Sequence, residues 1–213
     1  MQLVTLGLSY LLGSLPFGLL LARLTTGQDI RQIGSGRTGT TNTLRAAGYP
    51  IAIITFILDM AKSAAGVWLA RWLAPGQIWM EVLAPIAVIV GHNYSIFLLE
   101  QDERGRLRLR GGAGGASALG GTIGLWPPSI LILLPVGILI YFGVGYASVA
   151  TMSIGLIAAL IFAVRAWLGL SSWIYVAYGL LAEILLLWAL RPTIKNLLNG
   201  AERGIGWRAR RKK

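Results

Sequence analysis

One stretch of the sequence, from Gly111 to Val164, contains no Asp, Glu, Lys or Arg side chain. As an α-helix its 54 residues would extend for ~80 Å, more than twice the ~30 Å thickness of the hydrocarbon core of a bilayer. The composition agrees, because 55% of all residues are hydrophobic and only 13% are charged, against about 25% charged residues in a soluble domain. We therefore predict an all-α, polytopic membrane protein in which residues 1–213 form a single transmembrane domain.

The apolar segments predict seven transmembrane helices. Met1–Ala22 carries no charge and has neither a basic leading region nor a clear cleavage site, so we interpret it as a retained helix rather than a signal peptide. Within the charge-free stretch, Trp126–Pro128 and Gly143–Gly145 are the expected divisions between helices. The helices after the first are expected at about 49–72, 82–99, 111–126, 128–143, 145–167 and 172–190.

The positions of Lys and Arg predict the orientation of these helices. Four arginines flank the first long loop, four lie between residues 100 and 112, and eight basic residues follow Leu190, whereas only Arg71 and Arg165 fall on the other side. Because basic residues collect in cytoplasmic loops, the N-terminus is expected outside and the C-terminus in the cytoplasm. The predicted cytoplasmic segments are a motif loop at 25–48, a basic and Gly-rich loop at 100–114 and a basic tail at 191–213.

The composition also excludes several kinds of site. Without cysteine, the chain has no disulfide scaffold, zinc–thiolate site or thiol nucleophile. One histidine provides too few soft ligands for a transition-metal centre, so neither a metal nor a cofactor is expected. We attribute the net charge of +11 to topology and to contact with anionic lipid headgroups, and not to nucleic-acid binding.

The loop after the first helix, Gly34–Arg45, combines glycines, hydroxyl and amide side chains and two arginines. A glycine-rich backbone can form a nest of N–H groups around an anion, and guanidinium groups bind phosphate through paired hydrogen bonds. The loop therefore predicts a phosphate site in which Gly34 and Gly36 supply backbone donors. A flexible polar linker is the alternative interpretation.

A second glycine cluster, Gly111–Gly120, lies where the basic loop enters the fourth predicted helix. The unpaired N–H groups of a helix N-terminus attract anions. Small residues also allow membrane helices to pack closely. Both interpretations remain open for this cluster at the level of the sequence.

Four ionisable side chains lie within or beside the predicted spans. Asp59 and Lys62 are three residues apart and share a helix face, where they form either a site or a structural ion pair. His92 is expected near the inner end of the third helix, as a packing residue or a general base, and Glu183 is expected to bond a neighbouring helix. All except Glu183 lie near the predicted cytoplasmic face, which suggests chemistry that joins a phosphorylated water-soluble molecule to a lipid.

Short motifs follow one another in a characteristic order along residues 7–202: Gly13–Gly18, Gly34–Arg45, Leu58–Lys62, Gly91–Tyr94, Gly111–Gly120, Tyr146–Ser148 and Leu197–Glu202. In this order they resemble the bacterial acyl-phosphate:glycerol-3-phosphate acyltransferases (PlsY). The resemblance implies a seven-helix protein of the bacterial inner membrane. It also implies synthesis of lysophosphatidate from glycerol 3-phosphate and a fatty acyl phosphate, without acyl-CoA, metal or cofactor.

The resemblance implies roles for particular residues. Ser35, Asn42 and Arg45 belong to the active site in this comparison, and Arg45 holds a phosphate. The positions implied to contact substrate are completed by the glycines of the second cluster, a cation, a hydroxyl and a further possible lysine: Gly111, Gly112, Gly114, Lys62, Ser148 and Lys195. Glu202 is implied to have an architectural role.

The sequence departs from the family pattern at three positions. The family has Lys where this chain has Ala113, and it has His and Asn where the alignment places Leu190 and Thr193. Residues 100–110 resemble an insertion, whose arginines (Arg106, Arg108 and Arg110) either replace the missing Lys or contact anionic lipid. The expected function is acyl transfer to glycerol 3-phosphate. The alternatives are a catalytically impaired paralogue that binds a phosphorylated ligand or lipid, and a small anion transporter.

Overall fold

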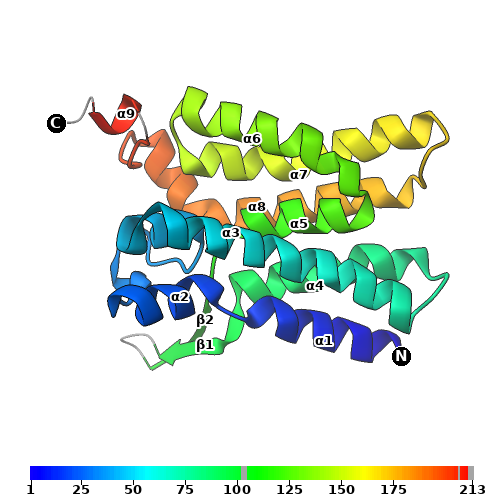
Figure 1. The fold of residues 1–213 in the computed structure, drawn as a ribbon, viewed down its shortest axis with the longest axis horizontal. Coiled ribbons are helices and arrows are strands. Elements are labelled where there is room, and N and C mark those ends of the chain that lie inside the picture. Colours follow the sequence, from blue (N-terminus) through cyan, green and yellow to red (C-terminus); the bar gives the residue numbers. More distant parts are fainter. Residues whose placement is uncertain (102–104, 206, 211–213) are drawn as a thin grey trace.

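The computed structural model describes residues 1–101, 105–205 and 207–210. Its helices run along one common axis, with the N-terminus at one end of the bundle and the C-terminal segment at the other (Figure 1). The elements that build the bundle are α1 (Gln2–Ser14), α2 (Phe17–Thr26), α3 (Thr40–Leu73), α4 (Ile78–Asn93), α5 (Gly115–Leu125), α6 (Ile130–Val144), α7 (Ala147–Trp167) and α8 (Ile174–Leu198). Short 3-10 turns occupy Ile30–Gln32 and Pro127–Ser129, and α9 covers Trp207–Arg210.

Counted with α1 and α2 as one broken segment, these helices form the seven predicted helical segments. Five stretches of the described chain are long and apolar enough to cross a membrane: 2–26, 40–73, 127–144, 147–167 and 174–198. The remaining two segments, α4 and α5, are shorter, at 16 and 11 residues. The fold class predicted from the charge-free stretch is confirmed.

The first predicted helix is broken in its middle. Leu15 adopts an extended conformation between α1 and α2, because the ring of Pro16 disfavours helical geometry at the residue before it. The chain then continues as helix to Thr26, which is four residues beyond the predicted end. Gly13 lets α1 approach α4, since a Cβ there would lie 2.2 Å from the carbonyl oxygen of Val88.

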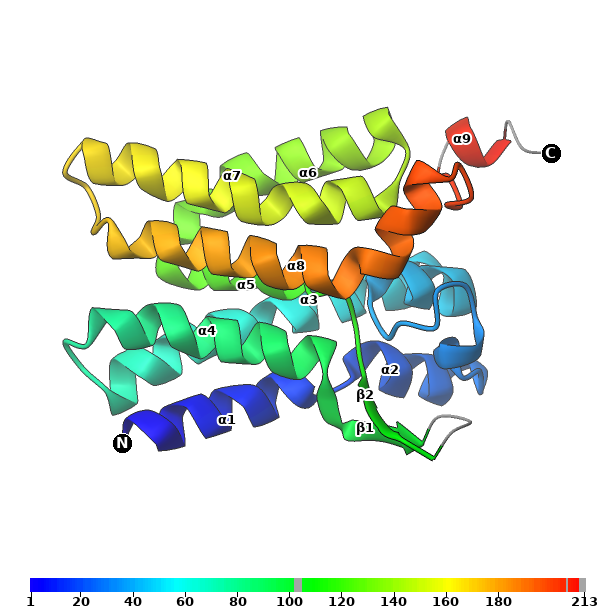
Figure 2. The ribbon, with the colours of Figure 1, turned by 180° about the vertical axis from the view of Figure 1, so that it is seen from behind.

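The third predicted helix is wrong at both ends. Helix α4 begins at Ile78, ends at Asn93 and is followed by a strand, so helix does not extend over 82–99 as predicted. Strands β1 (Ser95–Gln101) and β2 (Leu107–Arg110) pair antiparallel, with Glu100 opposite Arg108. The segment predicted as a basic loop is therefore a hairpin, and Figure 2 shows it beside α2. Residues 96–99 form a short apolar run between Ser95 and Glu100, and periodicity alone does not distinguish such a run in a strand from one in a helix.

Two further boundaries differ from the prediction. Helix α3 starts at Thr40, so the last third of the predicted motif loop is helical, and a bend at Gly48 separates this part from the membrane span. Helix α8 continues to Leu198 through Pro192, so the first part of the predicted basic tail is also helical. A proline inside a membrane helix is tolerated where neighbouring groups satisfy the freed backbone.

The core lies where α3, α4, α5, α7 and α8 meet, around Val67, Ile89, Phe162 and Tyr178. The two arginines predicted on the far side are both held there. Arg71 donates to Glu81 at 2.8 Å, and Arg165 stacks 4.0 Å from the ring centroid of Trp126. Helix α6 packs more loosely than the others, with Leu133 as its one fully buried residue, and this leaves space beside it.

Candidate functional site

A cavity of about 410 Å³ opens near the end of the bundle that carries the C-terminal segment. Its polar wall comes from the motif loop, the second glycine cluster and the chain after α8. Its apolar wall comes from α3, α5, α6 and α7. Side chains of the apolar wall include Phe56, Leu119, Leu134, Ile138 and Ile154.

Three helix N-termini meet at this cavity. Thr40 and Thr41 begin α3, Gly115 and Ala116 begin α5, and Ala147 and Ser148 begin α7, and all six residues line the wall. None of these three helices has a side-chain cap hydrogen bond at its N-cap residue. Unpaired N–H groups and the positive ends of three helix dipoles therefore face the same space, which favours an anion there.

Asn42 organises the motif loop. Its Nδ2 donates to the carbonyl oxygens of Ile33 at 2.8 Å and Arg37 at 2.9 Å. Its Oδ1 accepts from Nη1 of Arg45 at 2.9 Å and from the Ser35 N–H at 3.4 Å. Ser35, Asn42 and Arg45 all line the cavity, and Asn42 is buried. The structure thus brings together the three residues predicted as catalytic.

Gly34 lies in the same cluster, while Gly36 does not line the cavity. Gly34 has a φ of +58°, and a Cβ there would lie 2.6 Å from Oδ1 of Asn42 and 2.8 Å from Nη1 of Arg45. Only glycine fits both the left-handed backbone and the close approach. Gly36 has a φ of +69° and instead turns the chain beside Arg31.

Arg37 is the second arginine of the loop that was predicted to bind phosphate, and it had no separate role in the sequence analysis. Its guanidinium donates to the carbonyl oxygen of Gly112 at 2.9 Å and to that of Ala189, so it ties the motif loop to the second glycine cluster and to α8. Burial lowers the pKa of Arg37 below its ordinary value. Its place in the same loop as Arg45 indicated that Arg37 belongs to the site. The sequence could not show that its guanidinium donates to backbone carbonyl oxygens.

The second glycine cluster was predicted either to bind an anion or to allow close packing, and its glycines differ in this respect. A Cβ on Gly112 would lie 2.0 Å from Nε2 of His92, and one on Gly111 would lie 2.2 Å from the His92 carbonyl oxygen. The Gly112 N–H donates to that same oxygen at 2.8 Å. Gly111 and Gly112 are therefore packing glycines that do not line the cavity, and Gly114, at φ +88°, is the predicted substrate glycine that does.

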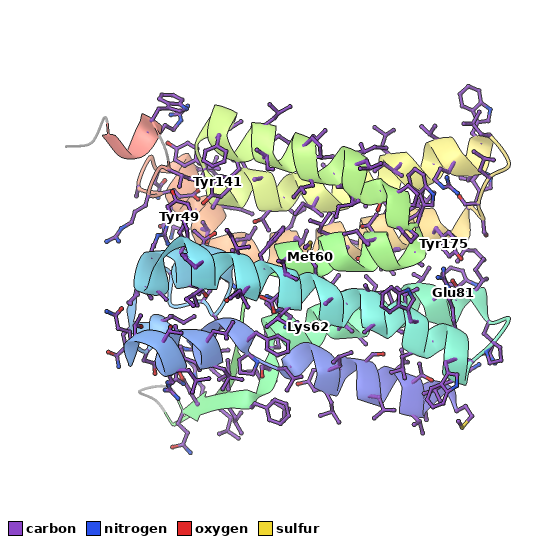
Figure 3. The ribbon with its side chains drawn as sticks, in the orientation of Figure 1. Tyr49, Met60, Lys62, Glu81, Tyr141 and Tyr175 are labelled. Carbon is purple, nitrogen blue, oxygen red and sulfur yellow. The ribbon has the colours of Figure 1, made fainter. Side chains whose placement is uncertain are left out.

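Asp59 and Lys62 of α3 and His92 of α4 form a buried triad. Lys62 Nζ lies 2.7 Å from Oδ1 of Asp59 and 2.9 Å from Nδ1 of His92. It also donates to the carbonyl oxygen of Leu15 at 3.0 Å, and Figure 3 shows it inside the bundle. Asp59 and His92 line the cavity, but Lys62 does not. The charge of Lys62 is thus paired with that of Asp59, and its contribution to substrate binding stays a prediction.

The chain after α8 closes the polar wall. Ser148, which lines the cavity, donates to Oε2 of Glu202 at 2.7 Å, and its implied contact with substrate stays a prediction. Asn196 and Arg203 line the cavity, whereas Lys195 does not.

Ala113, Leu190 and Thr193, the three positions that depart from the family pattern, all line the cavity. Arg106, Arg108 and Arg110 do not, and Arg110 pairs with Glu100 at 3.0 Å.

Glu183, which had no predicted partner, lies on α8 against α7. A Cβ on Gly155 would lie 2.7 Å from its Oε2, so Gly155 makes room for the carboxyl group. Glu183 is buried and is not part of the cavity wall. Among the described residues, no group of three or more His, Cys, Asp or Glu side chains could hold a metal ion.

Comparison with known proteins yields one family. A family model described as glycerol-3-phosphate acyltransferase matches residues 3–200. The glycerol-3-phosphate acyltransferase of Thermus thermophilus is 38% identical, over 96% of this chain and 96% of the relative. That of Rubrobacter xylanophilus is 35% identical, over 95% and 94%.

Two solved structures share the fold. Both are crystal structures of PlsY (YgiH), described as an integral membrane glycerol 3-phosphate acyltransferase. The glycerol 3-phosphate form aligns with a TM-score of 0.81 and 29% identity over 96% of both chains. The lysophosphatidic acid form aligns with a TM-score of 0.80 and 28% identity, over 96% of this chain and 95% of that one.

Proposed function

The chain belongs to the glycerol-3-phosphate acyltransferase family, and we propose that it transfers a fatty acyl group from acyl phosphate to glycerol 3-phosphate, giving lysophosphatidate for phospholipid synthesis. The relatives are named for glycerol 3-phosphate, and the solved neighbours are described as forms with glycerol 3-phosphate and with lysophosphatidic acid. The acyl phosphate donor and the lipid surroundings are the part of the proposal that goes beyond those names.

The convergence of three helix N-termini on a cavity with an apolar wall carries this proposal. A phosphorylated, water-soluble acceptor fits the polar wall, where N–H groups and Arg45 supply positive potential. A fatty acyl chain fits the apolar wall formed beside α6. The two substrates meet where these walls join.

In this proposal the reaction proceeds by direct attack. A hydroxyl oxygen of glycerol 3-phosphate attacks the acyl carbonyl carbon, the carbon–oxygen bond to phosphate breaks, and the departing phosphate takes the hydroxyl proton. The acyl phosphate is already activated, so no side-chain nucleophile is needed. Ser35 and the N–H groups around Gly34 and Gly114 stabilise the developing oxyanion, and Arg45 holds a phosphate in position.

We also propose the placement of the chain in the bacterial inner membrane. The motif loop, the basic hairpin and the tail lie at one end of the bundle (Figure 1), and most of the basic residues belong to these segments. Because basic residues favour the cytoplasmic side, that end faces the cytoplasm, where both phosphorylated substrates are water-accessible.

The deciding experiment is acyl transfer by the detergent-purified protein. A long-chain acyl phosphate and radiolabelled glycerol 3-phosphate are incubated with wild type, Ser35→Ala, Arg45→Ala and a control, Arg191→Ala. Arg191 is exposed and stacks on Trp188 outside the cavity. We expect labelled lysophosphatidate from wild type and Arg191→Ala, and a loss of about 100-fold or more in the other two, since each removes a donor aimed at transition-state charge.

Each remaining outcome favours a different function. Folded wild type that binds glycerol 3-phosphate but forms no product would identify a catalytically impaired paralogue. Wild-type rates in both Ser35→Ala and Arg45→Ala would overturn the assignment of the site. Movement of labelled phosphate across liposomes without acyl transfer would favour the transporter alternative.

A further inference from the structure

Arg203 is a cavity residue to which neither the family motifs nor the sequence analysis gives a role. It follows Glu202 in the segment between α8 and α9 and lines the same cavity as Arg45. Figure 3 shows Tyr141, another lining residue, on α6 at the end of the bundle that carries this segment. The C-terminal chain is thus part of the wall of the site.

Hydrogen bonds on both sides of Arg203 hold its backbone at the cavity. After α8 the chain turns back, with the N–H groups of Ala201 and Glu202 both donating to the carbonyl oxygen of Asn196, at 2.7 and 3.1 Å. Glu202 accepts from Ser148 on α7 at 2.7 Å. Beyond Arg203, the Ile205 N–H donates to the carbonyl oxygen of Gly145 at 2.8 Å.

A second anchor fixes the segment farther along. Nε of Arg208 donates to the carbonyl oxygen of Val144 at 2.7 Å, and its guanidinium stacks 4.8 Å from the ring centroid of Tyr146. The segment is therefore held to α7 and α8 before Arg203 and to the turn between α6 and α7 after it. This arrangement delivers one guanidinium to the cavity from a part of the chain far from the motif loop.

The other cations near the cavity are already engaged. Arg37 donates to two backbone carbonyls, and Lys62 is paired with Asp59. Arg45 donates to an uncharged acceptor, Oδ1 of Asn42. Among the described residues, no carboxylate forms an ion pair with Arg45 or Arg203. These two arginines are therefore the cations available to a ligand in the cavity.

Arg45 and Arg203 also act on each other as like charges, an effect that the Glu202 carboxylate of the same cavity opposes without forming an ion pair with either. Two guanidinium groups in one cavity without a paired carboxylate raise the energy of the empty site, and an anion between them removes that cost. Phosphate suits this arrangement, because each guanidinium can donate two parallel hydrogen bonds to its oxygens. The small side chain of Ala113 leaves the glycine cluster without a cation of its own.

We propose that Arg203 and Arg45 form a two-arginine clamp for a substrate phosphate, and that Arg203 supplies the charge absent at position 113. The clamp rests on the proposed function for the identity of its ligand. Its chemistry is that of a phosphate monoester or acyl phosphate, and both substrates of the proposed reaction carry such a group.

Steady-state kinetics with each substrate varied in turn identify which phosphate is held. Arg203→Ala should raise the KM for one phosphorylated substrate by about 10- to 100-fold, the loss expected for a charge-assisted hydrogen bond. Arg203→Lys should recover part of that loss. Arg191→Ala, an arginine at the same end of the bundle but outside the cavity, should match wild type.

A compensating variant separates binding from a merely structural role. Ala113→Lys in the Arg203→Ala background places a cation at another position on the wall of the same cavity, so it should lower the raised KM again without changing the melting temperature. Wild-type KM values for both substrates in Arg203→Ala would overturn the clamp. An elevated KM that neither Arg203→Lys nor Ala113→Lys lowers would also overturn it, since the effect would then come from a displaced segment.

Calorimetry can measure the binding of glycerol 3-phosphate and of inorganic phosphate in the absence of acyl donor. This measurement does not depend on turnover. If wild type has no transferase activity but binds either ligand at least 10-fold more tightly than Arg203→Ala, the proposed function fails and the clamp stands. If wild type is active and Arg203→Ala binds both ligands as wild type does, the clamp fails and the proposed function stands.

Discussion

At the scale of single residues, close contacts decide which glycines the fold requires. Gly112 sits against the imidazole of His92, whose other nitrogen lies 2.9 Å from Lys62. The imidazole cannot withdraw without disturbing the buried triad with Asp59. Gly7, in contrast, has no neighbouring atom within 4 Å of the position its Cβ would occupy.

Gly112→Ala is therefore expected to destabilise the protein and reduce acyl transfer. The added methyl group overlaps Nε2 of His92, and overpacking of this kind costs about 1–3 kcal/mol. The melting temperature in detergent and kcat/KM measure the effect. Gly7→Ala is the matched control and should leave both unchanged; equal behaviour of the two variants would contradict the role of Gly112.

A surface ion-pair cluster at the motif loop gives a prediction for pH. Asp29 accepts from Arg31 and Arg23, and the bonds to Arg31 hold the pKa of the Asp29 carboxyl well below its ordinary value of 3.8. A carboxyl with a depressed pKa stabilises the folded state above its unfolded pKa, and this contribution is lost as the pH falls through the folded pKa.

Asp29→Asn should accordingly lower the melting temperature by an amount that is constant between about pH 5 and 8 and shrinks below about pH 4. The stabilisation is expected to be at most about 1 kcal/mol, as for ion pairs near the surface. Melting curves of wild type and variant across this range provide the measurement. A difference that grows toward acid pH would have the opposite sign to this prediction.

At the scale of elements, the bend in α3 places two of the predicted catalytic residues. Thr40–Ala47 carries Asn42 and Arg45, and it joins the membrane span at Gly48, where φ is 77° and ψ is −179°. Side-chain-bearing residues avoid this backbone region. Without the bend, the first turns of α3 would continue along the axis of the span and would not lie across the cavity.

Gly48→Ala should therefore impair catalysis. The strained backbone costs about 1–3 kcal/mol, and a helix that relaxes toward a straight path moves Arg45 away from the position that Asn42 gives it. We expect a lower kcat/KM and a lower melting temperature than in wild type, with Gly7→Ala again as control. Unchanged kinetics would mean that the bend does not position Arg45.

At the scale of the whole molecule, the distribution of charge predicts which end of the bundle faces the cytoplasm. The absence of cysteine from the sequence makes this testable with single substitutions. Gln28 is exposed at the end with the cavity, and Gln77 is exposed in the turn between α3 and α4 at the opposite end.

In intact cells, a membrane-impermeant maleimide should label Gln77→Cys, and should label Gln28→Cys only after the membrane is made permeable. The reason is that the arginines near Gln28 retain that end in the cytoplasm. The unsubstituted protein provides a blank without thiols. The reverse labelling pattern would place the cavity outside the cell and would contradict the proposed access of cytoplasmic substrates.

Local patterns in the sequence determined the class of the fold and the number of helical segments, and the resemblance of its motifs to a known family implied the predicted catalytic trio. Membrane insertion follows from apolar runs, and the segment ends are marked by Pro, Gly and charge. The predicted trio, Ser35, Asn42 and Arg45, is close enough in sequence that one loop and one helical turn bring it together. These features depend on neighbours in sequence, so they could be read without a structure.

Only the tertiary structure decided how the remaining polar groups are used. Lys62 is paired with Asp59 behind the cavity wall, Arg37 binds backbone carbonyls, and Arg203 reaches the cavity from beyond α8. Each outcome depends on the rotation of a helix about its axis and on contacts between residues far apart in the chain. Hydrophobic packing sets those rotations for the bundle as a whole, and no local pattern of residues encodes them.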